Sequence, residues 1–272
     1  MRRTATTLLV TAGLFVGLVA NTAAGERSAG GLPGDLLPDL KMAKLYGLDL
    51  VTTPSGRTQL IFGTIGWNVG EGPLEARGRR LDPSDESMQV KQRIRRSDGT
   101  WRARSTAAVM FYSGDGHDHW HIRQFMLLNL YKTGAPGGDV YGLRKLGYCL
   151  LDATRKPHPP AGAPAAPAFP MGACGHADSV KVRTGLSVGW GDDYPPVYAH
   201  QWMDVTGLSP GEYRICSTVD PLNDFLERRE DNNQRWTDLR IDIAADEVEV
   251  LATGGAACGP GAAPAQSVQG VR

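Results

Sequence analysis

Short stretches in which apolar and polar residues alternate are the dominant pattern of this chain. Residues 88–94 (MQVKQRI) alternate through most of their length, which is the period of a half-buried β-strand. The Asp98-Gly99 step that follows favours a tight hairpin turn. The pattern therefore predicts a strand that turns back into a neighbour, with one face of the pair buried.

Further strands are predicted at short intervals, each bounded by turn-forming residues. They are expected at residues 48–51, 58–69, 107–112, 125–131, 197–205 and 211–219, and residues 235–250 end the ordered part. We find no long amphipathic helix in the sequence. Short strands separated by turns predict an all-β fold, a single β-sandwich-like domain with long loops and little helix.

The amino-acid composition indicates where the folded domain, the loops and the tail lie. Glycine and proline contribute 34 and 18 of the 272 residues, a larger share than the roughly 12% of average proteins, which disfavours a helical bundle. Residues 37–253 are predicted to form the domain, after a flexible segment at 25–36. Residues 153–172 are rich in proline and alanine and predict an inserted surface loop, because proline cannot join a strand ladder. Residues 254–272 form a Gly/Ala/Pro-rich tail.

The first 24 residues have the features of a secretory signal peptide. Arg2 and Arg3 precede a 13-residue apolar run at residues 8–20, and small residues follow at 22–24. The run is shorter than the roughly 20 residues of a membrane span. We expect a secreted protein without a membrane anchor in its mature form, with an uncleaved anchor as the alternative and twin-arginine export left open.

Basic and acidic residues balance, with 29 of each and a net charge of zero. Loss of the leader removes Arg2 and Arg3 but no acidic residue, so the mature chain has a charge of −2. Phosphate recognition usually requires a basic excess, so we expect no nucleic-acid partner.

An exported protein can form disulfides, and the chain has four cysteines, none of them in a CxxC motif. Three pairings are possible. We favour Cys149 with Cys174, which closes a loop around the proline-rich insertion, and Cys216 with Cys258, which fixes the tail.

Three of the six histidines lie within five positions, at His117, His119 and His121. On a strand these positions share one face, but a straight strand would spread them over roughly 13 Å. A bend or bulge would let them converge on one ion, and Gly114 and Gly116 make a bend plausible. Imidazole binds copper, zinc, iron and nickel, so the spacing predicts a metal site without naming the metal. Trp120 should face the opposite way, into a core.

Downstream motifs follow this cluster in a fixed order. They are residues 145–152 (KLGYCLLD), 185–189 (GLSVG) with Tyr194, 201–206 (QWMDVT), 208–213 (LSPGEY), and Glu227 with Asn232 and Asn233. With the HxHxH motif, this order resembles the lysyl oxidase family over about residues 38–245. The chain looks like a bacterial, secreted member of that family.

The resemblance implies a copper amine oxidase of the protein-lysine 6-oxidase type. Such enzymes use O₂ to oxidise primary amines, peptidyl lysine or small lysine-like amines, to aldehydes, and release NH₃ and H₂O₂. The resemblance assigns copper(II) to His117, His119 and His121. It assigns the organic cofactor, lysine tyrosylquinone, to a cross-link between Lys145 and Tyr194, so the two side chains should face one another beside the histidines. Without it, Lys145 would be interpreted as a surface charge and Tyr194 as a core residue.

The general base is not identified by the sequence. Asp192, Asp193, His176 and His200 all lie near the relevant motifs, and each could equally be a turn residue or an ordinary hydrogen-bonding group. Asp204, in the QWxDxT motif, is more simply explained by a structural role.

The resemblance also implies a possible calcium site. The family's ligands fall on Asp39, Leu40, Glu227, Asn232 and Asn233, whose oxygen atoms suit calcium. Arg229 stands where another acidic residue is expected, so the site requires this cation to point away. A set of surface turn residues is the alternative.

Two other functions remain open on the same residues. One is a metal enzyme without a quinone, such as a cupin-like dioxygenase or a zinc hydrolase. The other is a non-catalytic, secreted β-sandwich that binds metal. In both, Lys145 and Tyr194 would be ordinary residues.

Overall fold

The computed structural model describes residues 30–255 and Cys258, except residues 115, 134–139 and 199, and of residues 140–145 it describes only the backbone. The predicted signal peptide (1–24), the start of the segment 25–36 and most of the tail 254–272 lie outside the described residues. The described part forms strands and contains no helix, which confirms the predicted all-β class. It therefore includes no helix long and apolar enough to cross a membrane.

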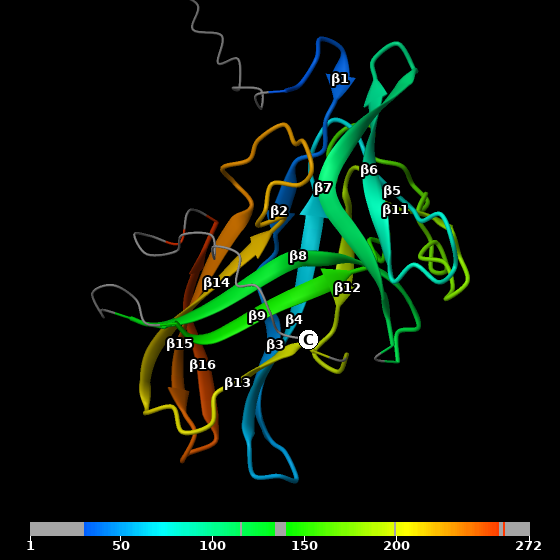
Figure 1. Ribbon diagram of the computed structural model, residues 1–272. Helices are drawn as coiled ribbons and strands as arrows, with labels where there is room; N and C mark the ends of the chain where they lie inside the picture. Colours follow the sequence, from blue (N-terminus) through cyan, green and yellow to red (C-terminus); the bar gives the residue numbers. More distant parts are fainter. Residues whose placement is uncertain (1–29, 115, 134–139, 199, 256–257, 259–272) are drawn as a thin grey trace, which may run out of the picture.

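The larger sheet is ten-stranded and antiparallel (Figure 1). Its order is β11 (Lys181–Leu186), β5 (Leu74–Arg79), β6 (Ser87–Arg96), β7 (Trp101–Ser113), β8 (His119–Lys132), β14 (Gly211–Val219), β15 (Gln234–Asp242) and β16 (Glu247–Gly254). Two strands lie off this path, β1 (Asp35–Leu36) beside β6 and β9 (Val140–Tyr148) beside β8.

The smaller sheet is six-stranded, and β4 (Thr58–Asn68) is its central strand. Its order is β10 (Thr154–Arg155), β12 (Trp190–Tyr194), β4 and β13 (Trp202–Asp204), with β2 (Leu40–Met42) and β3 (Tyr46–Thr52) also pairing with β4.

The two sheets pack over one apolar core, where β8 and β9 cross β4 (Figure 1). Phe62 of β4 and Trp120 and Phe125 of β8 are fully buried there. Gly66 of β4 lets the sheets approach closely, because a Cβ atom there would lie 2.8 Å from the Met126 methyl group of β8. This close packing holds the motif-bearing strands in fixed relative positions.

Several strand predictions are confirmed with small changes in their ends. The predicted strands at 58–69, 88–94 and 211–219 correspond to β4, β6 and β14, and the Asp98-Gly99 step turns β6 into β7 with a positive φ at Gly99. The predicted strand at 197–205 is wrong in its first half. Only β13 is extended there, because Tyr198 closes a turn onto the Pro195 carbonyl and His200 has a φ of 68°.

Both favoured disulfide pairings are confirmed. Cys149–Cys174 and Cys216–Cys258 each join Cα atoms that lie 5.8 Å apart. The insertion at 153–172 is mostly loop, with β10 as its one short strand among the described residues. Asp152 accepts hydrogen bonds from the backbone of Ala168 and Phe169, which fixes the far end of this loop to the domain.

Candidate metal and cofactor centre

The three clustered histidines lie where β7 passes into β8. His119 and His121 are in β8 and pair with Ser113 and Phe111 of β7, and His117 lies in the connection just before them. A bend was expected at Gly114 and Gly116, and Gly116 does have a positive φ of 93°. The regular alternation is also interrupted at Asp118, whose φ is 48°. Its carbonyl accepts a 2.8 Å hydrogen bond from the Tyr112 hydroxyl, which fixes the bent conformation.

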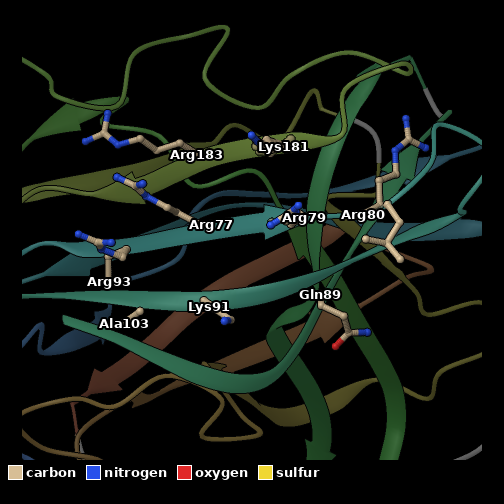
Figure 2. Close-up of a pocket in the computed structure, with 12 residues that line it drawn as sticks. Arg77, Arg79, Arg80, Gln89, Lys91, Arg93, Ala103, Lys181 and Arg183 are labelled. Carbon is tan, nitrogen blue, oxygen red and sulfur yellow. The ribbon is translucent and has the colours of Figure 1, made fainter. Parts of the chain in front are cut away.

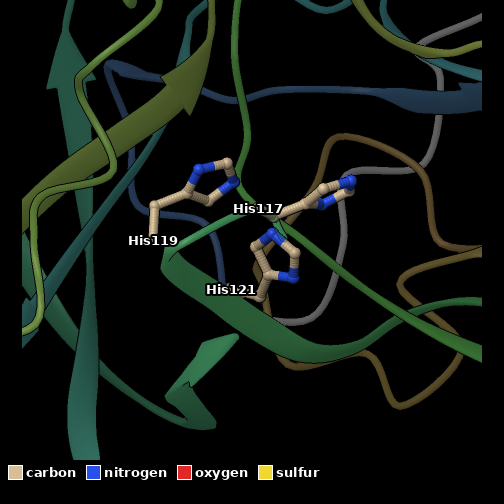
Figure 3. A group of neighbouring side chains, drawn as sticks. All are labelled: His117, His119 and His121. Atoms are coloured by element: carbon tan, nitrogen blue, oxygen red, sulfur yellow. The ribbon is translucent and has the colours of Figure 1, made fainter. Parts of the chain in front are cut away.

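The bend brings the three imidazoles together (Figure 3). One ligand nitrogen from each of His117, His119 and His121 lies within 4.8 Å of the others, compared with the roughly 13 Å span of a straight strand. His121 is buried and the other two are partly exposed. This arrangement suits an ion that prefers imidazole ligands and leaves one side open.

Trp120 faces the opposite side of the strand, as predicted, and is fully buried. Its backbone N–H donates to the Cys174 carbonyl at 3.0 Å, and its indole Nε1 donates to the His176 carbonyl at 2.8 Å. The Arg80 guanidinium lies 4.6 Å from the centre of its ring. These contacts restrict the strand segment from which His119 and His121 project.

Tyr194 lies beside the histidines at the end of β12. Its ring centre is 6.0 Å from that of His117, and its side chain is buried. The hydroxyl accepts a 3.2 Å hydrogen bond from the Cys149 backbone N–H. The Cys149–Cys174 disulfide therefore connects the residue that holds Tyr194 to the residue that holds Trp120.

Lys145 lies in β9, where its backbone pairs with Leu127 of β8. Its side chain lies outside the described residues, so the predicted contact between the Lys145 and Tyr194 side chains stays a prediction. In sequence, Lys145 is three residues before Tyr148, about 10 Å along a strand. The Tyr148 ring centre is 4.0 Å from that of Tyr194, so Tyr148 is the residue of this motif that the structure places against Tyr194.

The four candidates for the general base lie in different environments. Asp192 is buried, and it precedes Tyr194 by two residues on the same strand. Burial raises the pKa of its carboxyl group well above the ordinary value. Asp193 accepts a hydrogen bond from the Tyr46 hydroxyl. His176 and His200 are exposed.

A buried polar network behind Tyr194 was not predicted from the sequence. The hydroxyls of Tyr148 and Thr64 lie 2.6 Å apart, and Gln201 bonds to both, at 3.2 and 3.0 Å. Burial raises the pKa of Tyr148, so its hydroxyl stays protonated. Gln201 belongs to the QWxDxT motif, but Thr64 lies far away in sequence and only the packing of β4 brings it here.

Tyr198 forms the exposed side of the same region. Its ring centre is 5.7 Å from that of His117 and 5.9 Å from that of Tyr194, and 43% of the residue is exposed. An exposed aromatic face can attract a cationic group, so Tyr198 is placed to contact an incoming ammonium group. The sequence offered no signal for this role.

The five residues assigned to calcium lie together at another place. Asn232 donates to Asp39 at 2.9 Å, and the Glu227 carboxylate accepts from Asn233 at 2.7 Å and from the Leu40 backbone N–H at 2.5 Å. Arg229 points away, in an exposed ion pair with Asp231 at 3.1 Å.

Burial dominates the electrostatics of this cluster. Glu227 is fully buried, and burial together with the nearby Asp220 raises the pKa of Glu227 well above its ordinary value. Burial also raises the pKa of Asp220 to about 7. The buried Oδ1 atoms of Asn232 and Asn233 have no hydrogen-bond partner among the described residues. Carboxylate and amide oxygens buried together in this way are of the type that a hard cation such as calcium prefers.

Residues 171–250 match the family model for lysyl oxidase, and no curated protein matches the chain. The match confirms the resemblance to the lysyl oxidase family, a family of oxidoreductases of the copper amine oxidase kind. It includes Tyr194 and the late motifs, whereas the histidine cluster and Lys145 precede it.

Proposed function

We propose that this chain is a secreted, copper-dependent amine oxidase of the protein-lysine 6-oxidase type. It oxidises primary amines, peptidyl lysine or small lysine-like amines, to aldehydes with O₂ and releases NH₃ and H₂O₂. The observation that carries the proposal is that three converging histidines lie beside a buried tyrosine, with 6.0 Å between the His117 and Tyr194 rings. In a metal enzyme without a quinone, Tyr194 would be an ordinary core residue, so the activity of the Tyr194 variant separates the two functions.

The residues present fit the proposed groups. Three imidazole nitrogens within 4.8 Å of one another are suitable ligands for copper(II), and Tyr194 lies close enough to be modified by chemistry at that ion. When formed, lysine tyrosylquinone from Lys145 and Tyr194 supplies an electrophilic carbonyl and an electron sink for the amine's α-carbon.

The surrounding residues have distinct tasks in this proposal. Tyr198 contacts the substrate ammonium group at the exposed side, and the Tyr148–Thr64–Gln201 network fixes the plane of the Tyr194 ring from behind. Asp192 is the proposed general base and accepts the α-proton at Oδ2, a buried atom without a hydrogen-bond partner among the described residues. Because burial raises its pKa, the ionised form of Asp192 binds a proton more strongly than an exposed carboxylate does.

We also propose calcium at the cluster of Asp39, Leu40, Glu227, Asn232 and Asn233. The support is the type and burial of the oxygen atoms, and the orientation of Arg229 away from them. Calcium would compensate the buried carboxylates there. Added Ca²⁺ should raise the melting temperature at pH 8, and Asn233→Ala should remove that increase.

The function is tested with purified, copper-loaded protein. It should release H₂O₂ from n-butylamine or an Nα-acetyl-lysine amide and show a visible absorption band. Lys145→Ala and Tyr194→Phe should each abolish both signals. Lys44→Ala and Tyr131→Phe are matched controls away from the site and should retain them.

Two outcomes would contradict the proposal. One is full activity in either the Lys145 or the Tyr194 variant, because neither residue would then belong to the cofactor. The other is a protein that binds zinc in preference to copper and forms no peroxide, which would favour the metal enzyme without a quinone.

A further inference from the structure

One face of the larger sheet, which is not part of the histidine site, carries cations opposite one another on neighbouring strands. Arg183 of β11 pairs with Arg77 of β5, which pairs in turn with Lys91 of β6. Two residues away on each of the strands β11 and β5, Lys181 pairs with Arg79. Figure 2 shows these side chains along three adjacent strands. We call the outer surface of β11, β5 and β6 that bears them the basic face.

The alternation of the strands places these cations on the solvent side. Val182, Gly78 and Val90 lie between them and are buried, whereas the cationic positions are exposed. Arg93 extends the face along β6, and a groove with a volume of about 710 Å³ runs between the side chains. The basic face is therefore a continuous, accessible surface.

Few carboxylates neutralise the cations of the basic face. The buried carboxylate of Glu75 accepts from Arg77 at 2.7 Å and from Arg183 at 3.0 Å. Arg79, Lys91 and Lys181 have no carboxylate partner among the described residues.

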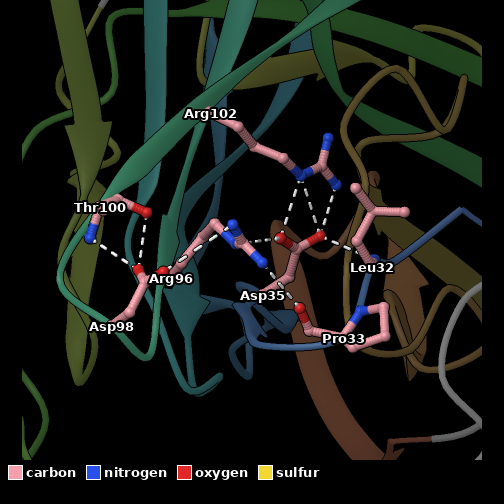
Figure 4. Close-up of polar contacts among 7 residues, drawn as sticks. All are labelled: Leu32, Pro33, Asp35, Arg96, Asp98, Thr100 and Arg102. Carbon is pink, nitrogen blue, oxygen red and sulfur yellow. Dashed lines mark hydrogen bonds and ion pairs between the residues drawn. The ribbon is translucent and has the colours of Figure 1, made fainter.

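Two arginines elsewhere in the same sheet share a buried carboxylate. Asp35 of β1 binds Arg102 of β7 through both carboxylate oxygens and lies 3.9 Å from Arg96 of β6 (Figure 4). The hydrogen bond from Arg102 lowers the pKa of the Asp35 carboxyl group. Asp35 therefore neutralises these two arginines, whereas Arg79, Lys91 and Lys181 of the basic face have no carboxylate partner among the described residues.

Like charges directly opposite one another on adjacent strands reduce sheet stability. Residues that lower the stability of a fold, with no stabilising contact that offsets the loss, tend to occur at functional sites. A bound polyanion would remove the repulsion and use all the cations at once. A cationic amine substrate would be repelled, so the basic face serves something other than the oxidation site.

We propose that the basic face binds a sulfated polysaccharide. Adjacent strands space the cations by about 4.8 Å and alternate residues by about 7 Å, so the face offers a flat array to a chain with regularly placed anions. Gln89, in the groove, supplies a hydrogen-bonding group for sugar hydroxyls. No aromatic side chain is among the described residues that line the groove, but the centre of the exposed Trp101 ring lies 6.0 Å from the Arg93 guanidinium carbon. Because base stacking needs such a ring, single-stranded DNA is the competing ligand in the test. The proposal is independent of copper and of the cofactor.

The test measures binding of a size-defined heparin oligosaccharide by calorimetry at 50 and 200 mM NaCl. Lys91→Gln/Lys181→Gln removes two cations that make no described structural contact. It should bind about tenfold more weakly than the unmodified protein, as expected from two exposed charge contacts. Lys44→Gln/Lys132→Gln changes the total charge equally and should bind within about twofold of the unmodified protein.

Three results would overturn the proposal. They are no binding of the oligosaccharide by the unmodified protein, equal binding by the Lys91/Lys181 variant, and tighter binding of a single-stranded or duplex DNA of equal charge. The melting temperature of the variant must be at least that of the unmodified protein, because the substitution relieves repulsion. Copper-free and copper-loaded protein should bind alike, so the result is separable from amine oxidase activity.

Discussion

Arg80 gives the sharpest test of how the histidine strand is held. It is 7% exposed. Its guanidinium donates to the carbonyls of Ser179, Pro83 and Asp85 at 2.8, 2.7 and 2.8 Å, and to that of Ala177. Its flat face packs on Trp120, between the two histidines of β8. One side chain thus joins two surface loops to the back of the metal site.

Replacement of Arg80 by alanine should be strongly destabilising. Hydrogen bonds from a charged donor contribute roughly 1.5–3 kcal/mol each, and a desolvated cation–π contact about 2 kcal/mol. The full sum is not lost, because loop carbonyls near the surface can bind water after truncation. We therefore expect the free energy of unfolding to fall by about 3–5 kcal/mol.

Urea unfolding of the metal-free protein measures this loss. Arg79→Ala is the matched control, since Arg79 is adjacent, exposed and unpaired among the described residues, and it should change stability by no more than about 0.5 kcal/mol. Copper affinity, measured by competition with a chelator, should fall about tenfold in Arg80→Ala, because support of the ligand strand is lost. A stability loss below about 1 kcal/mol would refute the packing argument. A large loss with unchanged copper affinity would show that Arg80 stabilises the fold but does not position the ligands.

Four other predictions follow from the site and its surroundings. Removal of the Cys149–Cys174 disulfide by a double alanine substitution should cost about 3 kcal/mol in urea unfolding, as expected for a separation of 25 residues. Asp220 keeps its proton up to about pH 7 in the folded state but only to about pH 4 when unfolded, so stability should fall as pH rises through that window. In EDTA, Asp220→Asn should match the unmodified protein at pH 4 and exceed its unfolding free energy at pH 8, and equal values at pH 8 would contradict the pKa shift. Asp192→Asn should lower kcat by about 10²–10⁴-fold with little change in copper content. A variant that retained kcat would exclude Asp192 as the general base. Tyr198→Ala should raise KM for the amine more than it lowers kcat, and an unchanged KM would remove Tyr198 from the substrate path.

Local signals predicted much of the fold. The strand at β6 and its hairpin were predictable because alternation and the Asp98-Gly99 turn act within a few residues. Strands β11 and β12 were missed, since they are short and pair with β5 and β4, which are far away in sequence. Strand β5 was missed although its partner β6 follows it directly in the chain. The order of strands in the two sheets is a property of long-range pairing, on which a single sequence carries little information.

The candidate site was predictable where its functional residues are close together in the sequence. His117, His119 and His121 were found from spacing alone, but the convergence depends on the positive φ of Asp118, a residue that only moderately favours this conformation. The residues around Tyr194 were not predictable in the same way. Thr64 and Tyr148 meet only because β4 and β9 pack across the core.

The net charge of the chain does not reveal how its charged residues are distributed over the surface. Exposed charges more than about 8–10 Å apart are largely screened at physiological salt, so the acidic residues elsewhere do not neutralise the basic face. A net charge of zero therefore disfavours a protein that is basic throughout, but says little about one sheet face. The absence of a nucleic-acid partner stays a prediction, and the DNA titration tests it. If the polysaccharide binds instead, the same separation of charge explains how one small domain could hold a polyanion on one face and receive a cationic amine at another.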